Sequence, residues 1–182
     1  MGKFRIILKS WNSADRDPKV KRLQKHCFSD VDPKDIEEYF YNEGFAMLLG
    51  LIDNKIVGLV GLFKRNVEFN GKRIVVGGIG GVCTQKNFRR KGIASKLIRR
   101  GLQILKDKKC DVACLNTDLS KTVYKLYEKN GFKLMKRKIS FEDVNGKIRY
   151  DTGAMFIPIG SKKIYNYIMN SKKTFHYGRG YW

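Results

Sequence analysis

Hydrophobic and polar positions follow two different rhythms along the chain. Short continuous apolar runs, and runs in which apolar and polar residues alternate, predict strands. These runs are residues 3–9, 45–53, 55–65, 72–84, 110–117, 132–143 and 147–159. Apolar positions that recur every three or four residues predict helices. The helical stretches are residues 17–27, 33–42, Gly92 to about 107, and 119–131.

Turn-forming residues show how these stretches connect. Asn70-Gly71 is typical of a type I′ hairpin turn, and Asn145-Gly146 predicts a second hairpin between the last two strands. Asp32-Pro33 is typical of a helix start, and Asn130-Gly131 of a helix end. The resulting order is strands, then strand–helix–strand–helix, then a hairpin. This order predicts a mixed α/β fold.

Length and composition favour a single domain. A chain of 182 residues with 42% apolar residues can bury a core of its own. We expect one domain over residues 1–182, with a core of about residues 1–158. Residues 159–182 have no acidic side chain and many aromatic ones, so we interpret them as a basic and aromatic C-terminal extension.

The charge balance favours anionic partners. The chain has 38 Lys and Arg against 17 Asp and Glu, a formal net charge of +21. Nucleic acid, a membrane surface and a phosphate-bearing cofactor all fit this charge, and so does a plainly solvated basic surface.

The cysteines and the apolar runs restrict the class of protein further. No group of Cys and His has the spacing of a zinc site, so we expect no metal. Cys83, Cys110 and Cys114 lie in apolar runs and are expected to be buried, reduced thiols. No run is long enough to span a membrane, and the first residues lack the core of a signal peptide. We therefore expect a cytoplasmic protein without a membrane partner.

The junction at residues 84–94 predicts an anion site. The start of a helix offers unpaired N–H groups, Gly92 lets a ligand approach the backbone, and Arg89, Arg90 and Lys91 add positive charge. The alternative is a surface helix with basic faces. The chain has no P-loop motif, and Gly77–Gly81 lies within a strand, not after one, so neither common nucleotide motif is present.

Two motifs carry a family resemblance. Arg89-x-x-Gly92-x-Ala94 resembles the Gln/Arg-x-x-Gly-x-Gly/Ala signature of the GCN5-related N-acetyltransferases (GNAT). The stretch SKTVYKLYEKNGF, residues 120–132, resembles the family's Asn-x-x-Ala-Ile-x-Leu-Tyr-Glu-Lys-x-Gly-Phe helix. Both occur in the family's order with a strand between them. The resemblance covers most of the chain. It implies a central mixed, mostly antiparallel sheet flanked by helices and split at the strand before the Arg-x-x-Gly-x-Ala turn.

The resemblance also implies acetyl-CoA as the co-substrate. Backbone N–H groups of the turn would hold its pyrophosphate, and the end of the preceding strand would pair with its pantetheine arm. In the family this strand splays from its neighbour after a bulge, which the glycines at 77, 78, 80 and 81 suit. Ser120 stands where the family has an Asn that contacts the same arm. The expected cofactor-binding residues are Val82, Cys83, Thr84, Arg89, Arg90, Lys91, Gly92, Ile93, Ala94, Ser95 and Ser120. Homodimers are common in the family.

The implied reaction is direct attack of an amine on the acetyl thioester. Tyr127 matches the family's tyrosine, and a phenol can donate a proton to the leaving thiolate. Core packing also explains Tyr127, and Tyr124 is the alternative donor. A backbone N–H near Val82 or Cys83 would stabilise the oxyanion.

The base is harder to assign, because the central strand lacks the glutamate that many members have and reads Gly80-Gly81 there. Asp118, Asp151 or a chain of waters could replace it. Cys83 as an acyl-carrying nucleophile has no histidine close in sequence to support it.

The acceptor site is expected at the acidic residues and the chain's last residue. Six acids lie in residues 30–43, where the family's first helices border the acceptor, although capping and surface charge explain them equally well. The ending on Trp182, with Asp151 before the last strand, resembles aminoglycoside 2′-N-acetyltransferases. Asp35, Asp151 and Trp182 are therefore the expected acceptor-binding residues, and a cationic small molecule such as an aminoglycoside is one candidate acceptor.

A binding module is the alternative from another class. Residues 159–182 interleave lysines with tyrosines, a pattern that suits single-stranded nucleic acid. An acetyltransferase acting on a peptide or protein would combine the two interpretations. The motif spacing at residues 89–94 and 120–132 favours the enzyme, because charge alone does not require it.

Overall fold

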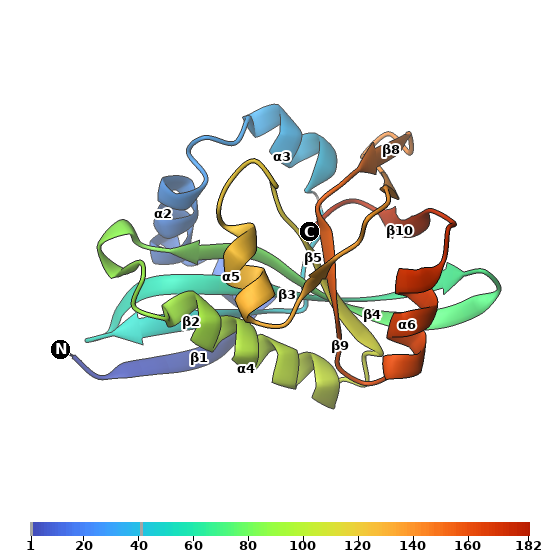
Figure 1. Cartoon of the computed structure of the whole chain (residues 1–182). Coiled ribbons are helices and arrows are strands. Elements are labelled where there is room, and N and C mark those ends of the chain that lie inside the picture. The colour runs from blue at the N-terminus through green and yellow to red at the C-terminus, as the bar shows by residue number, and fades with distance from the viewer. Residues whose placement is uncertain (1, 41) are drawn as a thin grey trace.

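The computed structural model describes residues 2–40 and 42–182 and has two sheets with helices on both sides of the larger one (Figure 1). The larger sheet has seven strands in the order β1-β2-β3-β4-β5-β9-β6. Its strands are β1 (Phe4–Ser10), β2 (Ala46–Ile52), β3 (Lys55–Phe69), β4 (Lys72–Thr84), β5 (Val112–Asn116), β6 (Lys133–Leu134) and β9 (Ala154–Pro158). The smaller sheet has the order β10-β7-β8 and consists of β7 (Ile139–Glu142), β8 (Ile148–Asp151) and β10 (Phe175–Arg179).

The helices are short except for one. They are α1 (Trp11–Asp15), α2 (Pro18–Cys27), α3 (Pro33–Tyr39), α4 (Ile93–Asp107), α5 (Tyr124–Lys129) and α6 (Lys162–Asn170), with a 3₁₀ turn, η1, at Lys86–Phe88. Asp17 and Asp32 cap α2 and α3 by accepting from backbone N–H groups, and a proline follows each cap.

Every neighbouring pair in the larger sheet is antiparallel except β4 with β5, which is parallel. The expected class, a mixed and mostly antiparallel sheet flanked by helices, is therefore confirmed. The bounds of β4 are those the sequence predicted, and the Asn70-Gly71 turn before it has positive φ at both residues, as a type I′ turn requires.

The pairing of β4 with β5 is brief. Val76, Gly77 and Gly78 pair with Val112–Cys114, after which β4 continues to Thr84 along β3. A register shift between β3 and β4 falls at Leu59/Gly61, opposite Gly81, whose φ is +55°. This bulge turns the end of β4, so the sheet is split beyond Gly78.

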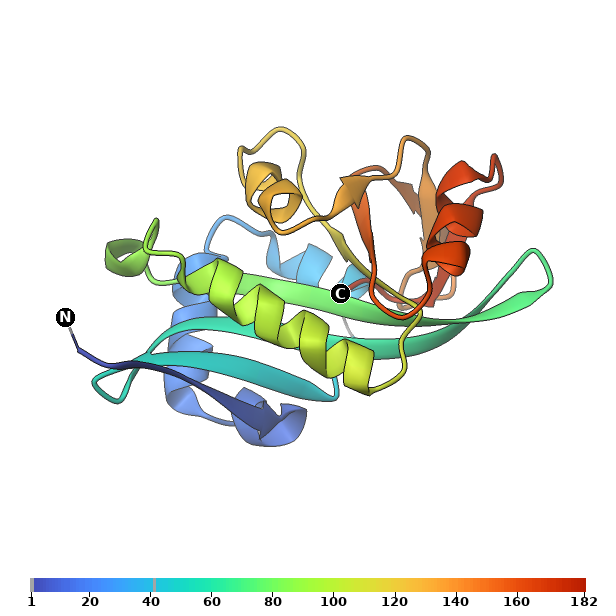
Figure 2. The ribbon, with the colours of Figure 1, turned by 60° about the horizontal axis from the view of Figure 1, so that its bottom comes forward.

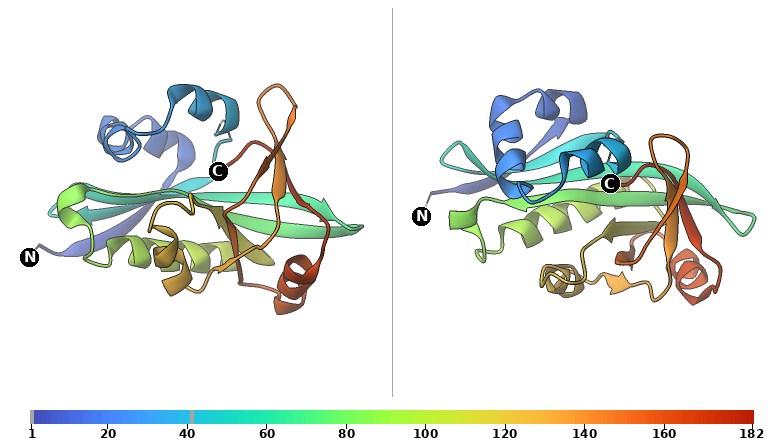
Figure 3. Two further views of the ribbon diagram at one scale, coloured as in Figure 1. Left: turned by 45° about the horizontal axis from the view of Figure 1, so that its top comes forward. Right: turned by 90° about the horizontal axis from the view of Figure 1, so that it is seen from above.

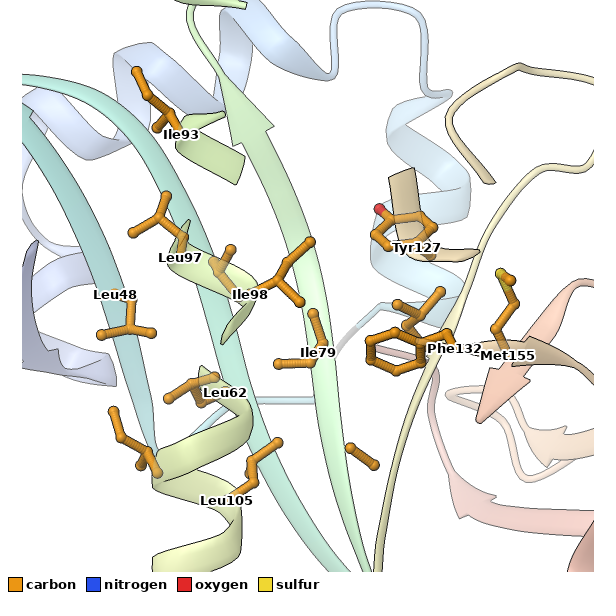
Figure 4. Packing of buried hydrophobic residues seen from close by; sticks show 14 of the residues in the cluster. Leu48, Leu62, Ile79, Ile93, Leu97, Ile98, Leu105, Tyr127, Phe132 and Met155 are labelled. Atoms are coloured by element: carbon orange, nitrogen blue, oxygen red, sulfur yellow. The ribbon is translucent and has the colours of Figure 1, made fainter. Parts of the chain in front are cut away.

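Helix α4 covers one face of the sheet, and α1 and α2 cover the other (Figure 2). Figure 4 shows Leu97, Ile98 and Leu105 of α4 beside Leu62 and Ile79 of the sheet. These α4 side chains are fully buried. Burial of each of these side chains stabilises the fold by about 1.5–3 kcal/mol. Because this packing holds α4 against the sheet, the first residue of α4 has a fixed position relative to the end of β4.

Residues 159–182 pack into the fold as α6 and β10. Strand β10 runs parallel to β7, and the chain then passes back toward the middle of the larger sheet (Figure 3). Phe175, Tyr177, Tyr181 and Trp182 are buried in one aromatic cluster with Phe63 of β3.

Three predicted elements differ from the structure. The helix predicted over residues 119–131 begins only at Tyr124, because Asp118 accepts from the N–H and hydroxyl of Ser120 and holds the chain in a turn. The strands predicted at 132–143 and 147–159 are each broken into two. Gly153, with φ +96°, separates β8 from β9, so the two pairs of strands join different sheets. The helices α1 and α6 and the strand β10 were not predicted.

The prediction of a reduced Cys83 is wrong. A disulfide joins Cys83 of β4 to Cys27 at the end of α2, 56 residues earlier. Helix α2 packs on β3 and β4, which brings together two cysteines that sequence spacing does not relate. This bond also removes Cys83 as a nucleophile. Cys110 and Cys114 are free and buried, as expected, and burial raises the pKa of the Cys114 thiol to about 12.

Within residues 2–40 and 42–182, no helix has both the length and the apolar character needed to cross a membrane.

Candidate functional site

The split between β4 and β5 lies at the centre of the molecule, and two of its glycines make room for the chain's last residue. A methyl group built on Gly78 would lie 2.6 Å from the Trp182 ring, and one on Gly80 would lie 2.8 Å from the carbonyl carbon of Trp182. Any larger side chain here would clash. Of the glycines predicted to suit a distorted strand, only Gly81 has the positive φ of a bulge.

The turn into α4 has the backbone that the anion-site prediction requires. Arg90 and Gly92 have φ of +59° and +75°, and the first helical bond runs from the Lys96 N–H to the Gly92 carbonyl. The N–H groups of residues 92–95 precede that bond and have no acceptor within the helix. Space around Gly92 is open, so its backbone conformation and not packing explains the glycine.

The side chains around this turn differ in their exposure and in their hydrogen bonds. Arg89, Arg90 and Lys91 are exposed. Arg89 donates from Nε to the Thr84 carbonyl at 3.1 Å, which ties the turn to the end of β4. Ser95 is nearly buried and accepts from Asn130 Nδ2 at 3.0 Å, so its hydroxyl joins α4 to α5. The turn therefore has N–H groups without an acceptor in the helix and three exposed cationic side chains beside them.

Tyr127 projects from α5 into the core cluster that contains Ile79 of β4 and Leu115 of β5. Its ring meets Phe132 edge-on, with centroids 6.4 Å apart, and its hydroxyl points away from Phe132 (Figure 4). Burial raises the pKa of Tyr127 to about 12, because a phenolate would lose its hydration. The phenol is therefore protonated at any pH near neutral.

A cavity of about 460 Å³ opens where β5 ends. We call it the Asp151 cavity, and it is lined by Phe40, Asn116, Thr117, Asp118, Leu119, Ser120, Asp151, Thr152, Tyr181 and Trp182. Three strands end near this cavity. Asn116 is the last residue of β5, Asp151 is the last residue of β8, and Tyr181 follows β10.

Asp151 joins the last residues of the chain to this cavity. One of its carboxylate oxygens accepts from the Thr152 N–H at 2.6 Å, and the other accepts from the Tyr181 hydroxyl. Burial, together with this bond to Asp151, raises the pKa of the Tyr181 phenol. The phenol therefore stays protonated and keeps donating.

Asp118 also faces the Asp151 cavity, as an exposed residue. The hydroxyl of Ser120 and then its N–H lower the pKa of this carboxyl by hydrogen bonding. Asp118 is thus a stable carboxylate at neutral pH and a weak base. Ser120 donates its hydroxyl to Asp118, so that hydroxyl is already engaged.

The structure brings together only part of the predicted site. Asp151, Trp182 and Ser120 line one cavity, whereas Asp35 lies exposed on α3 and is not among its lining residues. Three of the other acids of that region have structural partners. Asp32 caps α3, Asp30 pairs with Lys121, and Glu38 pairs with Arg149.

Sequence reasoning missed six of the ten residues that line the cavity, Phe40, Asn116 and Tyr181 among them. Phe40, Asn116 and Tyr181 belong to no motif. Asn116 directly follows the apolar run of β5, and a polar residue at the end of a central strand was the one available signal.

A sequence model described as the acetyltransferase (GNAT) domain matches residues 12–135. This match covers more than half of the chain, so the chain belongs to the GNAT acetyltransferases. The expectation of an acetyl-CoA-dependent N-acetyltransferase is thereby confirmed at the level of the family. A search of curated proteins finds no match.

Solved structures of the same fold include several acetyltransferases. A GNAT-family N-acetyltransferase of Escherichia coli, YhbS, crystallised with CoA, has a TM-score of 0.63 and 15% identity, over 98% of this chain and 91% of that chain. The aminoglycoside N-acetyltransferase AAC(6′)-Iy, in complex with a bisubstrate analogue, has a TM-score of 0.59 and 20% identity, over 74% and 94%.

Other matches are longer proteins. A GCN5-related N-acetyltransferase of Kribbella flavida has a TM-score of 0.56 and 20% identity over 78% of this chain but only 36% of its own. The chain thus spans about a third of the length of several structures it resembles. At these identities the likeness concerns the fold.

Proposed function

We propose that this chain transfers the acetyl group of acetyl-CoA directly to a primary amine, which reaches the sheet split through the Asp151 cavity. The observation that carries the proposal is the split itself. It has the unpaired N–H groups of residues 92–95 beyond the end of β4 and, where β5 ends, a cavity with two carboxylates. The split thus offers a place where an extended thioester and an amine can meet from different directions.

Acetyl-CoA is proposed to lie along the end of β4. Its pyrophosphate would accept from the N–H groups of the α4 turn, with Arg89, Arg90 and Lys91 adding charge. Its pantetheine arm would pair with the backbone of Val82–Thr84, which β5 no longer covers.

The proposed reaction balances as follows. The amine nitrogen attacks the acetyl carbonyl carbon, a C–N bond forms and the C–S bond breaks. The oxyanion is stabilised by a backbone N–H near Val82 or Cys83, and the thiolate takes a proton from Tyr127.

The amine must lose its own proton. Asp118 is a weak base, and Asp151 already accepts from Thr152 and Tyr181. We therefore assign water as the proton carrier and Asp151 to acceptor binding.

The test is acetyl-CoA-dependent thiol release across aminoglycosides, polyamines, simple amines and basic peptides. Aminoglycosides belong in the panel because the similar fold AAC(6′)-Iy bears that name. Turnover on at least one amine is expected. Absence of turnover on every amine, with acetyl-CoA bound, would overturn the proposed reaction.

The cofactor placement has a separate test. Arg89→Glu should weaken acetyl-CoA binding by about tenfold or more, because it sets a negative charge beside the pyrophosphate. Arg100→Glu makes the same charge change on the exposed face of α4, two turns further on, and should have little effect. Calorimetry of acetyl-CoA binding compares the two. Equal affinities would contradict the assignment of this turn.

A second candidate is peptide or protein acetylation, or nucleic-acid binding. The charge of +21 favours it. It predicts turnover on basic peptides but not on small amines.

A further inference from the structure

The Asp151 cavity combines two kinds of wall, and the combination narrows the class of acceptor. One wall is polar and contains Asp118, Asp151 and Asn116. The other is largely apolar and contains Phe40, Leu119, Tyr181 and Trp182.

The apolar wall is open to solvent in part. Phe40 and Leu119 keep 42% and 39% of their surface exposed, although both are large hydrophobic side chains. Phe40 is held in place, because its ring meets that of Tyr181 edge-on with centroids 5.5 Å apart. Tyr181 is in turn fixed by its bond to Asp151. The apolar wall is therefore preorganised beside a carboxylate.

The polar wall has unused binding capacity. Neither Asp118 nor Asp151 forms a salt bridge with any described residue, in a chain with 38 Lys and Arg. The Asn116 side chain adds an amide to this wall, next to the two carboxylates.

We infer that the acceptor is an amine with an apolar, ring-sized body, and not a polyhydroxylated polycation. This inference rests on the proposed function. The ammonium group is drawn to Asp151 and Asp118, and the apolar body lies against Phe40 and Leu119. The volume of about 460 Å³ suits one small molecule of this kind.

The first experiment compares 2-phenylethylamine with ethylamine, which differ by one phenyl ring, and includes spermidine and kanamycin. The expected kcat/KM for thiol release is about 10- to 100-fold higher for 2-phenylethylamine, from burial of the ring. Equal values for the two amines, or a preference for spermidine or kanamycin, would overturn the inference while leaving the acetyltransferase proposal intact. No turnover with any amine would overturn both.

Two variants test whether the preference for an amine with a ring comes from Phe40. Phe40→Ala should lower kcat/KM for 2-phenylethylamine about tenfold more than that for ethylamine, because only the former has a ring to lie against Phe40. The matched control is Ile36→Ala, one turn earlier on α3, because Ile36 is equally exposed but does not line the cavity. Similar losses in both variants would contradict a role of the Phe40 wall.

A binding measurement covers the case in which a variant loses activity by misfolding. Calorimetry of 2-phenylethylamine with the CoA-loaded protein should show binding that Asp151→Asn weakens about tenfold, with acetyl-CoA affinity unchanged. Unaltered amine binding in Asp151→Asn would remove the carboxylate from the inferred site.

Discussion

Tyr127 occupies a position that packing and chemistry both explain. Its ring is part of the core between β4 and β5, and the same burial keeps its phenol protonated. A residue buried for packing is thus protonated, as a proton donor must be, although the raised pKa also makes it a weaker acid. The two roles can be separated by removing the hydroxyl alone.

Tyr127→Phe should lower the rate of thiol release about 10²-fold or more, because the leaving thiolate loses its donor. Acetyl-CoA affinity should stay within about twofold, since the ring remains. Steady-state kinetics and calorimetry measure the two effects, and Tyr124→Phe is the control. A fully active Tyr127→Phe enzyme would move the donor to Tyr124 or water.

The pH dependence of wild-type turnover gives a second check. The pKa of Tyr127 is raised to about 12, so the donor form persists as pH rises through neutrality. We expect no loss of kcat from this group below about pH 10. A decrease in kcat with an apparent pKa near 8 that Tyr127→Phe abolishes would contradict the raised pKa of Tyr127 while leaving Tyr127 as the donor. The same decrease retained in Tyr127→Phe would belong to another group.

At Gly92 the cost of backbone strain can be measured separately from the effect on acetyl-CoA binding. Gly92→Ala forces an L-residue to φ +75° and should cost about 1 kcal/mol of folding free energy. It should also weaken acetyl-CoA binding. Gly71→Ala, at φ +72° in a hairpin turn with equally open surroundings, should cost similar stability without changing that affinity. Equal effects of the two variants on acetyl-CoA binding would contradict the assignment of the turn before α4 as the pyrophosphate site.

At the scale of elements, helices and strands that depend on local sequence could be predicted. Features that depend on contacts between distant segments could not. The bounds of β4 and the start of α4 follow from apolar runs, a turn pair and one glycine. The late start of α5 depends on Asp118 holding Ser120, a competition that helix periodicity does not reveal. The disulfide and the Asp151 cavity depend on which segments meet in space, and no spacing within the sequence encodes that.

The disulfide links α2 covalently to β4. It closes a loop of 56 residues, so its loss should lower the free energy of unfolding by up to about 4 kcal/mol. Cys27→Ser and reduced wild type should show the same lowered Tm, and Cys27→Ser should not respond to reductant. A wild-type Tm that reductant leaves unchanged would show that the bond contributes nothing to stability.

At the scale of the whole molecule, the charge of +21 acts on every anion and therefore does not distinguish a cofactor from a nucleic acid. Salt does distinguish them. Nucleic-acid affinity should fall about 10³-fold or more between about 50 and 200 mM salt, because counterions are released from each phosphate contacted. Acetyl-CoA held by fixed N–H groups should lose much less, as titrations at both salt concentrations can measure. Parallel losses would indicate that both anions bind by charge alone.

The position of Trp182 decides how this protein can be tagged or fused. Its carbonyl carbon lies against Gly80 and the residue lines the Asp151 cavity, whereas β1 lies at the edge of the larger sheet (Figure 1). A peptide attached after residue 182 would begin at the Asp151 cavity, the proposed route of the acceptor. A C-terminal affinity tag should therefore impair turnover in a protein that still folds and binds acetyl-CoA, and an N-terminal tag should be harmless.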